Sequence, residues 1–239
     1  MRLAKWVLFF CLLGGIYFGW NQSDLKKPAS VVWQQLRTNL SFRSHVETKL
    51  NQKNYVRMNQ IPLLFQQAII AIEDNRFYGH TGIDYEAVLR ATLVNLQSGE
   101  LVEGGSTITQ QLVKNLFLSQ DRTWSRKALE IPLTVLMEFQ FNKKEILEMY
   151  VNSIYFGSGA YGISSAAQTY FCKAPHSLNL AESSLIAGLP AAPSLYSPLV
   201  DFSISKKRQK MVLAAMVKHG YIKAQQAEEA ANAPILLPR

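Results

Sequence analysis

Residues that crosslink a chain or bind metal ions are scarce in this sequence of 239 residues. Its two cysteines are Cys11, inside an apolar run near the N-terminus, and Cys172, far along the chain. A disulfide would have to join that run to the rest of the protein, so we expect none. The four histidines are scattered, and neither they nor the cysteines follow the spacing of a metal-binding motif, so we expect no histidine-based metal site.

Alternation of apolar and polar residues, which is typical of half-buried strands, is nearly absent. Apolar residues instead recur at three- and four-residue spacing, which predicts helices from Ile61 onward and over 85–96, 109–117, 126–139, 143–151, 161–171, 179–189 and 205–219. Glycine-rich segments at 99–105 and 156–162 predict loops between them. The expected fold class is therefore mainly α.

Acidic residues are fewer than basic ones, 17 against 25, which gives a formal net charge of +8. This charge favours anionic partners such as phosphate-bearing lipids, a phospholipid surface or nucleic acid, and it does not choose among them. With 48% hydrophobic residues, a chain of this length can bury the core of one globular domain, or at most two.

Charged residues are missing from Trp6–Trp20 (WVLFFCLLGGIYFGW), which follows Arg2 and Lys5. Such a run is typical of a short transmembrane helix or of a signal peptide. Tyr17, Phe18 and Trp20 put large aromatic side chains where a signal peptidase requires small ones, so we favour a retained anchor.

The chain is thus expected to have three parts. Residues 1–22 form a cytoplasmic N-terminus and a transmembrane anchor, 23–59 a linker and approach segment, and 60–239 the globular domain. Because positive residues precede the apolar run, the N-terminus is expected in the cytoplasm and the globular domain outside the membrane.

The segment AIIAIEDNRFYGHTGID places Glu73, Phe77 and His80 on one helical face. Glu73 follows the apolar run 68–72, and desolvation by such neighbours raises the pKa of a carboxyl toward a value useful for proton transfer. The alternative is an exposed glutamate at a helix end, paired with Arg76, which the spacing alone favours.

The next polar segment, GGSTITQQLVKNLF, combines a flexible backbone with neutral hydrogen-bonding groups ahead of Lys114. Such a loop suits sugar hydroxyls and phosphate oxygens. The alternative is an ordinary helix start with Ser106 or Thr107 as its N-cap, and both interpretations can hold together.

A polar stripe follows, in which Arg126, Glu130, Thr134 and Glu138 recur every four residues. The alternative is a solvated helix face whose charges pair with one another. Pro132 lies within this pattern, so it should bend the helix near Glu130 or belong to its first turn.

These three segments, in this order, resemble the peptidoglycan glycosyltransferases of carbohydrate-enzyme family 51. Two further blocks agree with the resemblance, KEILEMYVNSIYFGSGAYGISSAAQTYF and LNLAESSLIAGLPAAPSLYSP. The resemblance covers about 61–198 and implies a lysozyme-like fold of two helical lobes with a cleft between them. Because the chain stops at Arg239, we expect a monofunctional transglycosylase without a transpeptidase domain. Cys172 departs from the family, in which glycine usually follows the phenylalanine.

The resemblance also implies roles for single residues. Glu73 is expected to be the catalytic base and Glu130 a second essential carboxylate that positions a divalent cation, Mg²⁺ or Mn²⁺, with no organic cofactor. Lys114, Arg126 and Lys127 are expected to hold the diphosphate of the substrate. The other expected substrate-binding residues are Asp74, Phe77, His80, Gly105, Ser106, Thr107, Gln110, Gln111 and Asn152.

The implied substrates are lipid II and the growing glycan strand, used at the outer face of the bacterial inner membrane by a single-pass, periplasmic enzyme. Cell-division or cell-wall synthesis proteins are further expected partners, and nucleic acid is not. The segment Tyr85 to Glu103 is expected to be a mobile lid that faces the membrane. Two alternatives stay open: a lytic, lysozyme-like glycosidase, and a membrane-anchored scaffold without catalysis.

Overall fold

The computed structural model describes residues 39–50, 54–100, 104–118 and 124–238, with the side chains of 39–41 and 124–128 left out. Its helices and short 3₁₀ turns (η) are α3 (Asn39–Leu50), η1 (Met58–Gln60), α4 (Leu63–Glu73), η2 (Phe77–Gly79), α5 (Tyr85–Ser98), α6 (Ile108–Phe117), α7 (Trp124–Gln140), α8 (Lys143–Ser153), α9 (Gly162–Phe171), η3 (Pro175–Ser177), α10 (Leu180–Ala187), α11 (Pro193–Tyr196), α12 (Phe202–Lys218) and α13 (Ala224–Asn232). Over these residues there is no strand, only an isolated bridge between Tyr155 and Tyr161. The prediction of a mainly α fold is confirmed.

The predicted anchor over 1–22 lies outside the described residues, as does the first part of the predicted linker. Within the ranges that are described, no helix combines the length and the apolar character needed to cross a bilayer. Helix α3 falls inside the segment predicted as linker, and it buries Phe42, Val46 and Leu50 in the common hydrophobic core. Packed structure therefore begins before residue 60.

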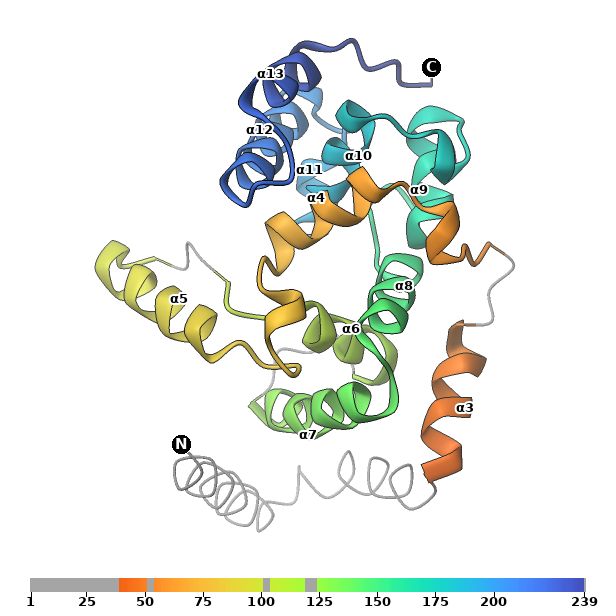
Figure 1. Cartoon of the computed structure of the whole chain (residues 1–239), viewed down its shortest axis with the longest axis vertical. Helices are drawn as coiled ribbons and strands as arrows, with labels where there is room; N and C mark the ends of the chain where they lie inside the picture. Colours follow the sequence, from red (N-terminus) through yellow and green to blue (C-terminus); the bar gives the residue numbers. More distant parts are fainter. Residues whose placement is uncertain (1–38, 51–53, 101–103, 119–123, 239) are drawn as a thin grey trace.

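The helices form two groups that share one core. Helix α4 packs against α10 and α12, which also contact each other, and α13 packs against α12. In the second group α6 packs against α7 and α8, and α9 packs against α8. Figure 1 shows α4, α10, α12 and α13 in the upper part of the molecule and α6 and α7 in the lower part. Buried side chains of both groups belong to a single hydrophobic cluster.

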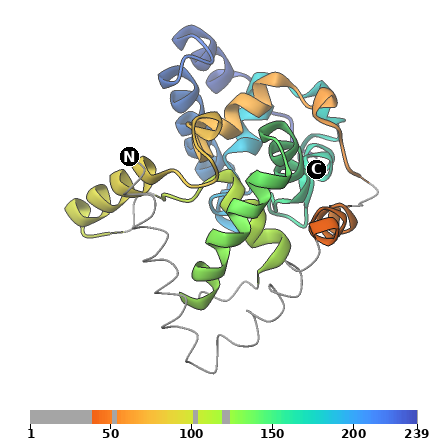
Figure 2. The same cartoon turned by 60° about the horizontal axis from the view of Figure 1, so that its bottom comes forward.

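Helix α5 differs from the others in how little it buries. It projects away from both groups in Figure 1 and in Figure 2. Ala91 is its buried residue, whereas Leu89, Leu93 and Leu96 are 65%, 60% and 75% exposed. Within the predicted lid segment, Tyr85–Ser98 is therefore a regular helix with an apolar, solvent-facing side.

Side-chain caps fix where several of these helices begin. Thr107 accepts a hydrogen bond from the backbone N–H of Gln110, and the Gln110 side chain accepts one from the backbone N–H of Thr107. Of the two residues predicted as the N-cap of α6, the observed one is therefore Thr107 and not Ser106. Pro132 lies in the interior of α7, so of the two alternatives the first-turn position is wrong, and the bend near Glu130 stays a prediction.

Cys172 ends helix α9 with φ of +53°, in the left-handed region that glycine adopts most easily. Its side chain is exposed. An L-residue in this conformation brings its Cβ close to the following carbonyl oxygen, which costs roughly 1 kcal/mol. The departure from the family's glycine thus leaves the turn in place and adds backbone strain.

Replacing Cys172 by glycine should therefore stabilise the protein. We expect Cys172→Gly to raise the free energy of unfolding by about 0.5–1 kcal/mol, because relief of the strain exceeds the added entropy of the unfolded chain. Cys172→Ala, which removes the thiol and keeps the Cβ, is the matched control and should change stability little. Urea unfolding of the three proteins measures this, and equal stability of the glycine and alanine variants would contradict it.

Candidate active site

Glu73 is the last residue of α4, and its side chain is only 8% exposed. Its Oε2 accepts a hydrogen bond of 2.8 Å from the Gln111 side-chain amide of α6. Arg76 pairs instead with Asp84 and Glu86. The alternative of an exposed Glu73 paired with Arg76 is therefore wrong, and the predicted desolvation of the Glu73 carboxyl is confirmed.

The second oxygen of Glu73 is in an unusual position. Within the described part of the chain, Oε1 is buried and has no hydrogen-bond partner. The guanidinium of Arg208 on α12 lies close to this oxygen, with Nη2 at 4.0 Å from Oε1. A buried carboxylate oxygen without a donor is poorly stabilised as an anion, so it is well suited to accept a proton.

Burial raises the pKa of Glu73 above its ordinary value of 4.5. Three groups oppose this increase: the hydrogen bond from Gln111 and the positive charges of Arg208 and Lys114 lower the same pKa. The net direction is upward because desolvation is the largest effect. The carboxyl is thus shifted toward the range in which a general base works.

Tyr150 of α8 orients the donor to Glu73. Its hydroxyl donates a 3.0 Å hydrogen bond to the carbonyl oxygen of the Gln111 side chain, which leaves the amide NH₂ facing Glu73. Tyr150 is fully buried, and burial followed by the charge of Glu73 raises its pKa well above 10, so it stays a donor. The chain of contacts from Tyr150 through Gln111 to Glu73 joins α8, α6 and α4.

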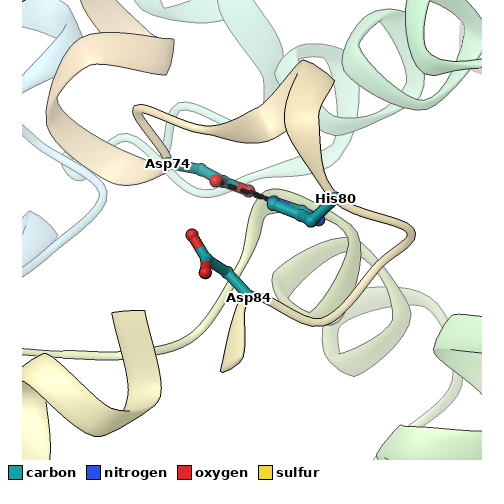
Figure 3. Close-up of side chains that lie close together, drawn as sticks. All are labelled: Asp74, His80 and Asp84. Atoms are coloured by element: carbon teal, nitrogen blue, oxygen red, sulfur yellow. Dashed lines mark hydrogen bonds and ion pairs between the residues drawn. The ribbon is translucent and has the colours of Figure 1, made fainter. Parts of the chain in front are cut away.

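Asp74 and His80 form a second network directly beside Glu73 (Figure 3). The His80 Nε2 lies 2.9 and 3.1 Å from the two Asp74 oxygens, and the Gly82 backbone N–H donates to Nδ1. Because Nδ1 accepts, the proton belongs on Nε2 and points at Asp74. Asp74 also accepts a 2.9 Å hydrogen bond from the backbone N–H of Ile108, the first residue of α6. The network therefore fixes the end of α4 to the start of α6.

Asp84 completes a cluster of possible metal ligands with Asp74 and His80, whose donor atoms lie within 4.8 Å of one another. Two carboxylates and an imidazole are compatible with a divalent cation. Asp84, however, already caps α5 through two backbone N–H groups and pairs with Arg76. A cation bound here would have to replace existing hydrogen bonds. Glu130, where the sequence placed the cation, is not part of this cluster.

The remaining predicted residues fall into three sets. Lys114 acts on Glu73 through its charge, and Glu130 is buried in α7, at 3% exposure. Phe77 and Asn152 are buried: Phe77 packs beside His80, whereas the Asn152 side-chain amide bonds to backbone groups of Val56 and Glu148 and so joins the segment before α4 to α8.

The third set comprises two residues just before α6 and two residues of α7 whose side chains are not among those described. Gly105 and Ser106 precede the cap of α6, with Gly105 in close approach to Val88 of α5. Arg126 and Lys127 belong to α7, and their side chains lie outside the described residues. Their predicted contact with a diphosphate stays a prediction.

The predicted cleft between two helical lobes likewise stays a prediction. A cavity of about 690 Å³ lies elsewhere, between α3, the segment 54–57 and α8, and none of the predicted site residues lines it. Its walls carry opposite charges that pair with each other, including Arg43 with Glu145 and Arg57 with Glu148. We therefore place the candidate active site at Glu73.

Sequence reasoning missed Tyr150 and Arg208. Tyr150 lies among apolar residues of a helix, where a core aromatic is the ordinary expectation. Arg208 lies beyond the segment that carries the resemblance. Only the fold brings both of them to Glu73.

The burial of Glu73 leads to a prediction about stability. A carboxyl whose pKa is raised in the folded state binds its proton more tightly there than in the unfolded chain, so its ionisation lowers stability as the pH rises above the unfolded value of 4.5. We expect the Tm of Glu73→Gln to equal that of the parent near pH 4 and to exceed it at pH 8.

Thermal unfolding across this pH range provides the measurement. Glu228→Gln, at an exposed position on α13, is the matched control, and its Tm should follow that of the parent at every pH. A Glu73→Gln protein that is less stable than the parent at pH 8 would contradict the prediction.

Comparison with known proteins identifies the family. The family model described as Transglycosylase matches residues 41–217, a range that includes all the site residues above. Penicillin-binding protein 1A of Aquifex aeolicus (strain VF5) is 45% identical over 190 residues, 80% of this chain and 26% of the relative. Penicillin-binding protein 1F of Bacillus subtilis (strain 168) is 45% identical over 172 residues, 72% of this chain and 24% of the relative.

A third relative, penicillin-binding protein 1A of Pseudomonas aeruginosa, is 46% identical over 180 residues, 75% of this chain and 22% of the relative. The chain thus spans about a quarter of the length of these curated relatives. A crystal structure of penicillin-binding protein 1A from Haemophilus influenzae aligns with a TM-score of 0.48 and 26% identity over 77% of this chain and 18% of that one. At that score the structural likeness carries no argument, and the assignment rests on the sequence matches. The chain belongs to the transglycosylase family.

Proposed function

We propose that the protein is a peptidoglycan glycosyltransferase that polymerises lipid II into β-1,4-linked glycan strands and releases undecaprenyl diphosphate. The observation that carries the proposal is the Glu73 carboxylate, which is buried, held by Gln111 through one oxygen and free of hydrogen bonds at the other within the described residues. The membership of the transglycosylase family supports the same conclusion.

Glu73 acts as the general base in this proposal. Its Oε1 takes the proton from the 4-hydroxyl of the acceptor sugar while that oxygen bonds to the anomeric carbon of the growing strand. The anomeric carbon–oxygen bond to the diphosphate breaks at the same time, and its electron pair leaves with the diphosphate. Attack from the face opposite the leaving group inverts α to β, as in inverting glycosidases, and requires no covalent intermediate.

Positive charge is needed where the diphosphate leaves. Lys114 lies close enough to Glu73 to lower the pKa of its carboxyl, so it is placed for this task, with Arg126 and Lys127 as the further candidates. A divalent cation, Mg²⁺ or Mn²⁺, would neutralise developing negative charge if Glu130 or the cluster of Asp74, His80 and Asp84 held it. The chain's own basic residues perform the same electrostatic role.

The arrangement of the helices supports a lysozyme-like, two-lobed fold. Glu73 lies where the group around α4 meets the group around α6, which is where a cleft between lobes would open. The exposed apolar side of α5 suits a surface that rests on a bilayer, and a polyprenyl substrate requires such contact. We propose that α5 belongs to the membrane-facing lid, with the predicted anchor holding a periplasmic domain at the inner membrane.

A buried glutamate could act in the synthesis of glycan strands or in their hydrolysis, and the charges around Glu73 favour synthesis. A lytic glycosidase has little need for basic residues beside its base, whereas a diphosphate leaving group requires them, and Lys114 and Arg208 both act on Glu73. We further propose that the protein transfers glycan without transpeptidase activity. Cell-division or cell-wall synthesis proteins are its proposed partners and recruit it.

The test of the proposed function is polymerisation of labelled lipid II by the purified protein, with and without Mg²⁺. We expect glycan polymer from the parent and a loss of about 10²- to 10⁴-fold in rate for Glu73→Gln, because that variant keeps the shape of the side chain and loses the base. Glu228→Gln, an exposed control, should polymerise at the parent rate. Shortening of purified glycan strands without any lipid substrate would instead indicate the lytic enzyme.

The hydrogen bond from Tyr150 gives a second test. Tyr150→Phe removes the hydroxyl that orients the Gln111 amide, so the amide can turn its carbonyl toward Glu73. Loss of one hydrogen bond of this kind corresponds to about 1–1.5 kcal/mol, and we expect kcat for lipid II to fall about tenfold. Tyr55→Phe, at a tyrosine that bonds Glu148 away from the site, is the control and should keep the parent kcat. An unchanged kcat in Tyr150→Phe would show that the orientation of Gln111 does not matter.

A further inference from the structure

Arg208 is the cation of α12 that faces the free oxygen of Glu73. Its side chain is 12% exposed, and the 4.0 Å between its Nη2 and Glu73 Oε1 is too long for a hydrogen bond. Both groups are largely buried, so solvent and salt screen their attraction much less than that of a surface pair. The charge of Arg208 therefore reaches Glu73 without occupying the oxygen that has to accept a proton.

Two neighbours hold the guanidinium at this distance. The Arg208 Nε donates a 3.1 Å hydrogen bond to the backbone carbonyl of Gly188, at the end of α10. The guanidinium carbon lies 5.3 Å from the ring centroid of Tyr196 on α11, a cation–π contact. Because its Nε is bonded to Gly188 and its guanidinium carbon lies over the Tyr196 ring, Arg208 has little freedom to move closer to Glu73.

Gly188 also provides the space that the Arg208 side chain needs. A Cβ at position 188 would lie 2.8 Å from the Arg208 Cγ, closer than side-chain atoms approach each other. That carbon lies near the root of the side chain, so it cannot move aside without displacing the guanidinium. The absence of a side chain at Gly188 and the position of Arg208 thus depend on each other.

We propose that Arg208 is a positioning residue for the general base: its guanidinium, 4.0 Å from Oε1, keeps the buried Glu73 carboxylate aimed at the acceptor hydroxyl without taking up Oε1 in a hydrogen bond. The inference rests on the proposed function. A directly bonded arginine would compete with the hydroxyl for the lone pairs of Oε1, and a distant one would not offset the desolvation of the anion. The 4.0 Å separation satisfies both requirements.

Other charged groups act on Glu73 as well, which limits the size of the effect. Lys114 of α6 supports the carboxylate in the same sense as Arg208, and Asp74 opposes both. The acidic residue of α10, Glu182, is paired with Lys173 at the other end of that helix. Loss of Arg208 should therefore weaken the base without abolishing it.

The experiment compares kcat and KM for lipid II in the full chain with Arg208 altered. We expect Arg208→Ala to lower kcat about 10- to 100-fold with KM within threefold of the parent. Added guanidinium should raise the kcat of Arg208→Ala at least fivefold. A misfolded variant would not respond to guanidinium in this way. Gly188→Ala, which keeps the charge and displaces it, should lower kcat in the same direction.

Lys210→Ala is the matched control, since it removes one positive charge from an exposed position of the same helix. Its kcat should stay within twofold of the parent. An unchanged kcat in Arg208→Ala would overturn the inference, and so would a large rise of KM alone, which would make Arg208 a substrate contact. A loss of kcat that guanidinium does not restore would assign Arg208 to the support of the fold.

A double-mutant cycle separates the inference from the proposed function. Urea unfolding of Glu73→Gln, Arg208→Ala and the double variant should give non-additive changes in stability, because each substitution removes one partner of the pair. This measurement needs no substrate. A coupled pair in a parent that does not polymerise lipid II would refute the proposed function and with it the role of Arg208 in catalysis. Additive changes in a parent that does polymerise lipid II would refute the inference alone.

Discussion

The site depends on burying one carboxylate away from water while one of its two oxygens is left without a hydrogen bond from the described residues. Glu73 lies at the junction of the two helix groups, with Gln111 reaching it from α6 and Arg208 from α12. An isolated anion in such surroundings would bind a proton and become neutral, so the flanking donor and cation are what make burial compatible with charge. The packing of α4 against α10 and α12, and its hydrogen bond to α6 through Gln111, therefore set the surroundings of its last residue.

The adjacent carboxylates of Glu73 and Asp74 have opposite environments. Asp74 is bonded to His80 and to the first backbone N–H of α6, and it has the hydrogen-bond partners that a buried carboxylate requires. Among the described residues, the Glu73 side chain has a single hydrogen bond. One neighbour thus anchors the backbone, and the other keeps an oxygen without a hydrogen bond in the described part of the chain. Two residues that look alike in the sequence therefore differ in what the fold places around them, and only Glu73 is proposed for proton transfer.

For two helices with an apolar face, the predicted bounds lie close to the observed ones. The predicted 143–151 and 85–96 correspond to Lys143–Ser153 and Tyr85–Ser98. Periodicity did not find α3, whose buried Phe42, Val46 and Leu50 stand among polar residues, or α13, whose inward side is mostly alanine. Motifs identified Glu73 and its hydrogen-bond donor Gln111. They could not find Tyr150 or Arg208, because nothing local to a helix tells which residues another helix brings to it.

The contribution of Arg208 bears on how this domain can be cut from, or joined to, other proteins. The recognisable motifs end near Pro198, and a boundary drawn there would keep each of them. Such a fragment would contain Glu73, the proposed proton acceptor, and lack the cation that faces it, along with the α12 surface that packs against α4. Chimeras between members of this family should therefore carry the helix through Lys218 as part of the same exchangeable unit.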